Sequence, residues 1–144
     1  MPTDTQSFSL APVSLTVLVV DDDQTTLELV RAVLETEGHK VLTWNRPFGT
    51  TQLVLRHRPD VILLDVRMPG LNGVELAKLV NARHRAPQCV ILHSSVSEVE
   101  LYRLGQEAGV VGAIPKTDNV AAFLEDFRRL THQCRCGRRA RREA

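Results

Sequence analysis

The chain has 144 residues, of which 43% are hydrophobic and 24% are charged, and its formal net charge is +1. This length fits one domain of ordinary size and leaves no room for a second large one. No apolar run approaches the roughly 20 residues that a membrane-spanning helix needs, and the first residues lack the basic-then-apolar order of a signal peptide. We therefore expect a soluble, cytoplasmic protein.

The charge is unevenly distributed along the chain. From Arg128 to the end there are seven arginines and one acid, Glu143, which gives a net charge of +6. Residues 1–127 hold 11 basic and 16 acidic residues, a net charge of −5. An acidic body followed by a basic end indicates an Arg-rich tail, which we place at residues 132–144. Residues 1–14, rich in Ser, Thr, Pro and Gln, are expected to be a flexible leader, and residues 15–131 the folded domain.

The tail offers weak signals of its own. Its arginines could bind nucleic acid phosphates, but basic tails are commonly just solvated, and no aromatic residue is interleaved to stack on bases. Nucleic acid is therefore the less favoured partner. His132, Cys134 and Cys136 lack the second pair of ligands that a zinc site needs.

Apolar runs alternate with amphipathic segments along the chain. Strands are expected at residues 15–20, 39–44, 61–64, 89–92 and 110–114, and helices at 24–37, 48–57, 74–84, 97–109 and from Asp118 or Asn119 onward. Five strand-then-helix units in this order predict an α/β fold with a five-stranded parallel sheet, doubly wound by helices on both faces.

Polar residues end four of these strands. Asp21-Asp22-Asp23 follows the first strand, Asp65 the third, Ser94-Ser95 the fourth and Lys116 the fifth. A lone Asp65 could simply end its strand, but parallel strands bring all four groups to the carboxyl edge of the sheet, where ligands bind. Carboxylates gathered there repel each other and call for a hard cation such as Mg²⁺. One carboxylate is then free to act as a nucleophile toward a phosphoryl group.

A known family carries this arrangement. The order Val17-Leu18-Val19-Val20-Asp21-Asp22-Asp23, then Asp60-Val61-Ile62-Leu63-Leu64-Asp65-Val66-Arg67-Met68-Pro69-Gly70-Leu71-Asn72-Gly73, then Ser94-Ser95 and Lys116, resembles the receiver domain of bacterial two-component response regulators. The resemblance covers roughly residues 15–131. It implies the flavodoxin-like (βα)5 receiver fold and Mg²⁺ as cofactor.

The resemblance also implies the roles of the acidic residues. Asp65 would be the phosphoacceptor and a ligand to Mg²⁺. Asp22 would bind Mg²⁺ directly, Asp21 would assist through a water molecule, and the backbone carbonyl of Arg67 would complete the protein ligands. Asp23 is interpreted as a helix-start acid instead of a ligand.

The remaining residues of the resemblance imply a switch. Ser94, Ser95 and Lys116 would bind the phosphoryl group and change the surface formed by the fourth helix, fifth strand and fifth helix. The donor would be a phosphohistidine on a sensor histidine kinase or phosphotransfer protein, and the output would lie in a separate effector protein, with a homodimer possible through the same surface. The protein would be no enzyme beyond its own phosphorylation and dephosphorylation.

Three positions depart from the family pattern. Ala113 stands where the family usually has Tyr or Phe, so a ring-flip readout is not expected and a shift of the loop after the fourth strand takes its place. Thr117 stands where the family has a Pro joined by a cis bond, so either a strained bond is retained or the loop takes another path. His93 occupies a commonly apolar position and is interpreted as a buried, neutral side chain.

Two alternatives stay open at this point. The first is a pseudo-receiver that is never phosphorylated and acts only as an interaction module. Ala113 and Thr117 favour it slightly, and the intact acidic cluster with Asp65, Ser94 and Lys116 opposes it more strongly. The second is a phosphatase with an Asp nucleophile and Mg²⁺. Such enzymes commonly place a second Asp two residues after the nucleophile as acid and base, and that position here is Arg67.

Overall fold

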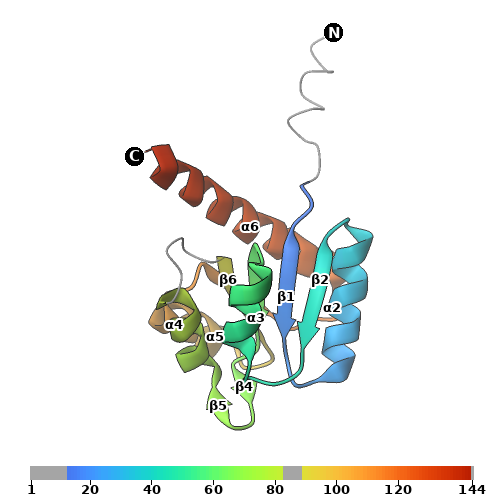
Figure 1. Cartoon of the computed structure of the whole chain (residues 1–144). Helices are drawn as coiled ribbons and strands as arrows, with labels where there is room; N and C mark the ends of the chain where they lie inside the picture. The colour runs from blue at the N-terminus through green and yellow to red at the C-terminus, as the bar shows by residue number, and fades with distance from the viewer. Residues whose placement is uncertain (1–12, 83–88, 144) are drawn as a thin grey trace.

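The computed structural model describes residues 13–82 and 89–143 (Figure 1). Most of the expected leader, residues 1–12, and the expected helix end at His84 lie outside the described residues. The strands are β1 (Thr16–Val20), β2 (Lys40–Trp44), β3 (Val61–Leu64), β4 (Arg67–Met68), β5 (Leu71–Asn72), β6 (Cys89–Ser94) and β7 (Gly112–Pro115). The helices are α2 (Gln24–Thr36), α3 (Thr50–His57), α4 (Gly73–Ala82), α5 (Glu98–Ala108) and α6 (Val120–Glu143).

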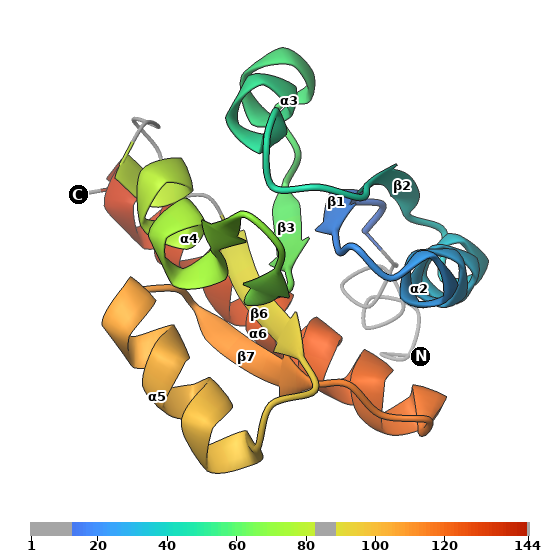
Figure 2. The same cartoon turned by 90° about the horizontal axis from the view of Figure 1, so that it is seen from below.

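Five of the strands form one parallel sheet in the order β2-β1-β3-β6-β7. The view in Figure 2 shows α2 and α6 on one face of this sheet and α3, α4 and α5 on the other. The predicted α/β fold, a doubly wound five-stranded sheet, is therefore confirmed. The strand order reverses direction on either side of β1, which places a switch point between β1 and β3, where ligands bind in such sheets.

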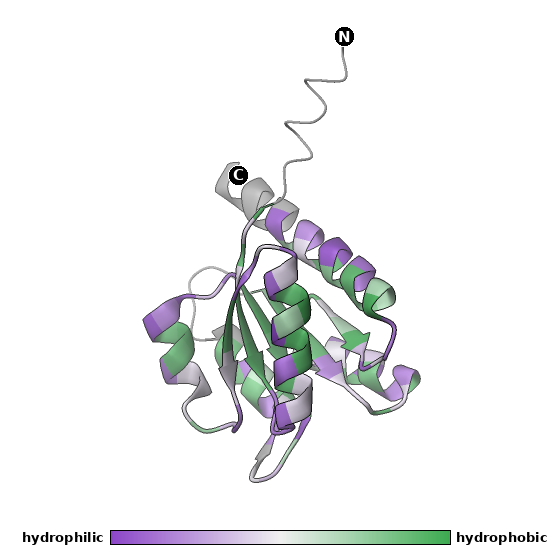
Figure 3. Ribbon diagram, turned by 90° about the vertical axis from the view of Figure 1, so that its right-hand side faces the viewer, coloured by the Kyte–Doolittle hydropathy of each residue, from purple (hydrophilic) through white to green (hydrophobic). Residues whose placement is uncertain are grey.

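The central strands are apolar on both faces because helices cover both faces. Every residue of β3 and β6 is buried, and Figure 3 shows the sheet as the most hydrophobic part of the molecule. Side chains of alternate strand residues enter two separate cores. One core lies between the sheet and helices α3, α4 and α5. The other lies between the sheet and helices α2 and α6, and Phe123, Phe127 and Leu130 of α6 are part of it.

Local signals account for the helix boundaries. Asp23 caps α2 by accepting a hydrogen bond from the Thr25 amide, and Ser97 caps α5 through the Glu100 amide. Of the two expected caps for α6, Asn119 is the one that acts, since its side chain accepts from the Ala122 amide. Gly109 ends α5 in the left-handed conformation that glycine adopts without strain.

The structure adds two features to the predicted elements. Residues 67–72, which lie between the strand expected at 61–64 and the helix expected at 74–84, form a short antiparallel hairpin of β4 and β5. The second feature is α6, which continues as one helix of 24 residues through the segment predicted as a basic tail. Among the described residues, no peptide bond is cis, so the strained bond considered for Thr117 is not retained. Within residues 13–82 and 89–143, no helix is both long and apolar enough to cross a membrane.

Candidate functional site

The acidic residues that follow β1 and β3 meet at the carboxyl edge of the sheet. The backbone holds them there, because the Asp65 amide donates to the Val20 carbonyl at 3.0 Å. Each of Asp21, Asp22 and Asp65 offers a carboxylate oxygen, and these atoms lie within 4.8 Å of one another. Asp21 and Asp65 are buried while Asp22 is exposed, so the cluster has a closed side and a side that faces solvent.

Lys116 bridges two of these carboxylates. Its Nζ lies 2.8 Å from Asp21 Oδ2 and 3.1 Å from Asp65 Oδ2. The Lys116 amide also donates to the Ser94 carbonyl at 2.9 Å, which fixes the lysine beside the end of β6. The residues that end β1, β3, β6 and β7 are therefore brought together, and the ammonium group lies between the carboxylates of Asp21 and Asp65.

Burial and the excess of carboxylates determine the electrostatics of the cluster. Burial raises the pKa of Asp21, and the neighbouring Asp65 carboxylate raises it further, against the hydrogen bonds from Lys116 and the Asp23 amide. Burial alone would lower the pKa of Lys116, but Asp21 and Asp65 outweigh it and raise that pKa. Lys116 thus stays a cation at neutral pH, and the cluster retains room for more positive charge.

Ser94 contributes a hydroxyl without a partner. Its side chain is fully buried at the end of β6, and its Oγ has no hydrogen-bond partner among the described residues. A buried hydroxyl without a partner costs free energy, which is a reason to expect that another group binds it. Ser95, the next residue, is exposed on the loop.

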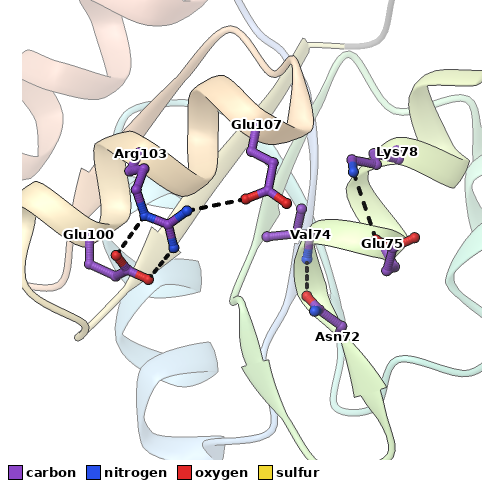
Figure 4. Close-up of polar contacts among 7 residues, drawn as sticks. All are labelled: Asn72, Val74, Glu75, Lys78, Glu100, Arg103 and Glu107. Atoms are coloured by element: carbon purple, nitrogen blue, oxygen red, sulfur yellow. Dashed lines mark hydrogen bonds and ion pairs between the residues drawn. The ribbon is translucent and has the colours of Figure 1, made fainter.

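The loop after Asp65 is held close to it. The Arg67 amide donates to Asp65 Oδ1 at 3.0 Å, and Asn72 Oδ1 accepts from the Val74 amide to start α4, as Figure 4 shows. A Cβ added to Gly73 would lie 2.7 Å from the Asp65 carbonyl oxygen and 2.4 Å from Val66 Cα. Gly73 is therefore required for this close approach. Sequence reasoning placed Gly73 in a motif but gave it no role, since a backbone contact leaves no periodic pattern.

Two neighbouring residues have the roles that the sequence predicts. Asp23 is a helix cap, since its carboxylate also accepts from the Thr26 hydroxyl, and this bond lowers the pKa of Asp23. His93 is buried against the Phe123 ring, with ring centroids 5.4 Å apart. Burial, with a smaller contribution from the Lys116 charge, lowers the pKa of His93 to about 4. The prediction of a buried, neutral histidine is confirmed.

A groove adjoins the site on the side of α2 and α6. It has a volume of about 310 Å³ and extends from Lys116 between the two helices, with the exposed Leu29 and Val120 at its rims and His93 and Phe123 in its lining. The sequence did not indicate this groove, because its lining comes from residues nearly 100 positions apart.

Comparison with known proteins identifies the family. Residues 17–128 match the model of the response regulator receiver domain. The chain belongs to this family. Receiver domains of this kind are parts of two-component systems, so the predicted resemblance is confirmed.

Individual relatives agree with this assignment. Protein-glutamate methylesterase/protein-glutamine glutaminase of Rhodopseudomonas palustris is 29% identical over 136 residues, which are 92% of this chain. The chain spans only 38% of that relative. The polar-differentiation response regulator DivK of Brucella anthropi is 27% identical over 116 residues, 78% of this chain and 92% of DivK. Among solved structures, the BeF3-activated receiver domain of Klebsiella pneumoniae RstA aligns with a TM-score of 0.73 and 26% identity, over 81% of this chain and 97% of that one.

Proposed function

We propose that this receiver domain, residues 15–131, is a phosphorylation switch in which Asp65 accepts a phosphoryl group from a phosphohistidine. The observation that carries the proposal is the position of the Lys116 ammonium group, 2.8 Å from Asp21 and 3.1 Å from Asp65 at the carboxyl edge of the sheet. A partly buried cation beside an acceptor carboxylate is what a site needs when negative charge is about to increase there.

The acidic cluster fits Mg²⁺. Three carboxylate oxygens within 4.8 Å of one another, one carboxylate exposed, match a small hard cation that keeps several waters. Asp22 and Asp65 would bind the ion directly, together with the Arg67 carbonyl, and Asp21 would act through a water molecule. When bound, the ion neutralises charge on phosphoryl oxygens.

The transfer itself needs few protein groups. A carboxylate oxygen of Asp65 forms a bond to phosphorus as the phosphorus–nitrogen bond of the donor breaks, and the electron pair of that bond remains on the imidazole nitrogen. Lys116 stabilises the oxygens that now carry the charge. The Ser94 hydroxyl, buried and without a partner in the described structure, would donate a hydrogen bond to one of them.

The switch would pass from Ser94 to the surface of α5, β7 and α6. Because Ala113 replaces the aromatic ring of the family, the movement would be a shift of the loop that carries Ser94 and Ser95. The added phosphoryl group carries nearly two negative charges at neutral pH, and it would favour one of two pre-existing arrangements of this surface. A separate effector protein or a second copy would recognise that arrangement.

The donor would approach over the groove between α2 and α6. A phosphohistidine must reach Asp65 from the carboxyl edge, and this apolar groove begins at Lys116 on that edge. Leu29 and Val120, which are 50% and 42% exposed, would contact the sensor kinase or phosphotransfer protein.

A pseudo-receiver is the second candidate, and Ala113 favours it. Ala113 is buried in β7, and a Cβ on Gly105 of α5 would lie 3.8 Å from the Ala113 methyl group. Two small residues thus meet where a family member has a ring. A chain with this packing could keep the fold as a constitutive interaction module without any chemistry at Asp65.

Phosphoryl uptake separates the two candidates. The purified protein is incubated with Mg²⁺ and acetyl phosphate, and its intact mass is measured. We expect a gain of one phosphoryl group that Asp65→Asn abolishes and that the nearby exposed Asp118→Asn retains. Absence of uptake by folded wild-type protein, or uptake that persists in Asp65→Asn, would contradict the proposal. Removal of Mg²⁺ with a chelator should also stop uptake.

A further inference from the structure

The sequence of α6 from Arg135 onward contains few apolar residues that could hold this end of the helix against the domain. Within residues 120–135, the part of α6 whose side chains the structure describes, the last buried residues are Leu130 and Thr131, and Cys134 is half-buried. From Arg135 onward the sequence has five arginines, one glutamate and only small uncharged residues. A helix that is polar on all sides is not stabilised by packing on a hydrophobic core, so its charged side chains remain available to a charged partner.

The positive charge of α6 is concentrated in this last part. Arg128 forms an ion pair with Glu37, and Arg129 pairs with Asp126 at 3.2 Å, so the two arginines closest to the domain are balanced locally. Arg135 is exposed. The excess positive charge of the chain therefore begins after the helix leaves its packing on the sheet.

The spacing of the arginines groups them along the helix. Arg135, Arg138, Arg139 and Arg142 follow one another at intervals of three and four residues within α6, which places these positions on one side of an α-helix. They span about 10 Å of helix axis. In Figure 1 this end of α6 lies on the side of the sheet where the strands begin, opposite to the carboxyl edge.

The residue types favour one class of partner. The basic residues after Arg128 are all arginine, the side chain that binds phosphates with two parallel hydrogen bonds. A membrane surface would require a large apolar face, which residues 135–143 lack. Single-stranded nucleic acid would require aromatic side chains for stacking, and these are also absent from that segment. The phosphate backbone of a double helix can be bound without an apolar face and without aromatic side chains.

We infer that residues 135–143 of α6 bind double-stranded DNA through its phosphates, without sequence preference. A straight α-helix fits the major groove of DNA, which is about 12 Å wide, but not the narrow major groove of double-stranded RNA. This inference goes beyond the proposed phosphorylation switch and does not depend on it, because the binding residues lie at the opposite edge of the sheet.

Fluorescence polarisation with a labelled DNA duplex of mixed sequence tests the inference. For wild-type protein we expect a Kd between about 1 and 100 μM at physiological salt and a slope of log K against log salt near −4, as about four phosphate contacts predict. Replacing Arg138, Arg139 and Arg142 by Gln should weaken binding at least about tenfold at 0.1 M salt and reduce the slope by about 3. A single-stranded probe and an RNA duplex should bind more weakly than the DNA duplex.

A matched variant controls for net charge. Lys40, Arg56 and Lys78 are exposed on other elements, so replacing all three by Gln removes the same charge and should leave DNA affinity within about twofold of wild type. Equal losses in the two variants, or no binding by wild type, would overturn the inference. So would salt-sensitive self-association that needs the same arginines and is unaffected by DNA, since the helix would then bind the acidic body of a second copy. Light scattering without DNA detects that outcome, and circular dichroism verifies the fold of each variant.

Discussion

A charge cluster on α5 and the cluster at the carboxyl edge of the sheet have similar ion-pair distances and different surroundings. On α5, Arg103 lies 2.6 Å from Glu100 and 3.4 Å from Glu107, and the side chains are 44–58% exposed (Figure 4). At the carboxyl edge, Lys116 lies 2.8 Å from Asp21 and 3.1 Å from Asp65, and the side chains are 1–21% exposed.

The difference shows that burial, and not ion-pair distance, decides what a charge cluster can do. Water screens the α5 cluster, and each of its charges can be solvated when a partner is lost. At the carboxyl edge the carboxylates cannot recover that hydration, so removing one charge leaves another uncompensated. The same burial raises the pKa of Asp21 and makes the edge attractive to a cation.

Removing the central ammonium group should have the largest effect. In Lys116→Ala, buried Asp21 and Asp65 face each other without a cation, and we expect the free energy of unfolding to fall by about 3 kcal/mol in metal-free buffer. Urea denaturation measures this loss, and added Mg²⁺ should recover part of it. Lys78→Ala, which removes an exposed lysine paired with Glu75, serves as control. Equal losses in both variants would show that the edge is no more sensitive than the surface.

Acidification should affect the domain through His93. Its pKa is about 4 in the folded protein, below the 6.5 of an unperturbed histidine, so the unfolded state takes up the proton first. Stability should therefore fall as pH decreases from about 6.5 to about 4, by about 3 kcal/mol in total. His93→Leu should flatten this part of the stability profile, whereas the exposed His57→Gln should leave it unchanged. If the free energy of unfolding of His93→Leu still fell by the same amount between about pH 6.5 and 4, His93 would not be the source of the acid sensitivity.

Two glycine substitutions, one beside Asp65 and one on α5, test how tightly the backbone packs around Asp65. In Gly73→Ala, the new Cβ would lie 2.4 Å from Val66 Cα, so the loop must shift and we expect a loss of about 2 kcal/mol and slower phosphoryl uptake. In Gly105→Ala, the nearest atom would be at 3.7 Å, and the helix should gain up to about 1 kcal/mol. Thermal melts and uptake rates measure both effects. Similar melting temperatures would mean that the loop adapts without cost.

The smallest effect is expected on α5. Arg103→Ala removes two ion pairs at once, but all three side chains are exposed. We expect no resolvable change in the urea midpoint and an unchanged rate of phosphoryl uptake. A loss comparable to that of Lys116→Ala would remove the distinction between the two clusters.

Much of the site could be predicted because strand burial leaves a strong sequence signal. β3 is a continuous apolar run that ends at Asp65, and parallel strands must present their ends at one edge. The same argument predicted that Lys116, which lies 51 residues after Asp65 in the sequence, would be at this edge. That Lys116 pairs with Asp21 and Asp65 while Asp22 stays exposed could not be predicted, since side-chain burial depends on the packing of the loops.

Features without periodicity were missed. The β4–β5 hairpin has strands of two residues, too short for any alternation to show. The continuation of α6 to Glu143 was not predicted because the apolar helical spacing stops near Cys134. The groove between α2 and α6 was missed because it depends on how two distant helices pack.

The length of α6 couples two ends of the molecule mechanically. The helix is about 36 Å long, and Phe123 near its start contacts His93, the neighbour of Ser94. A tilt of only about 5° about that contact would swing the arginine-bearing end by about 3 Å. Such a tilt would make the helix a lever arm, in which a slight displacement beside Asp65 would become a change of contact distance at the far side of the domain.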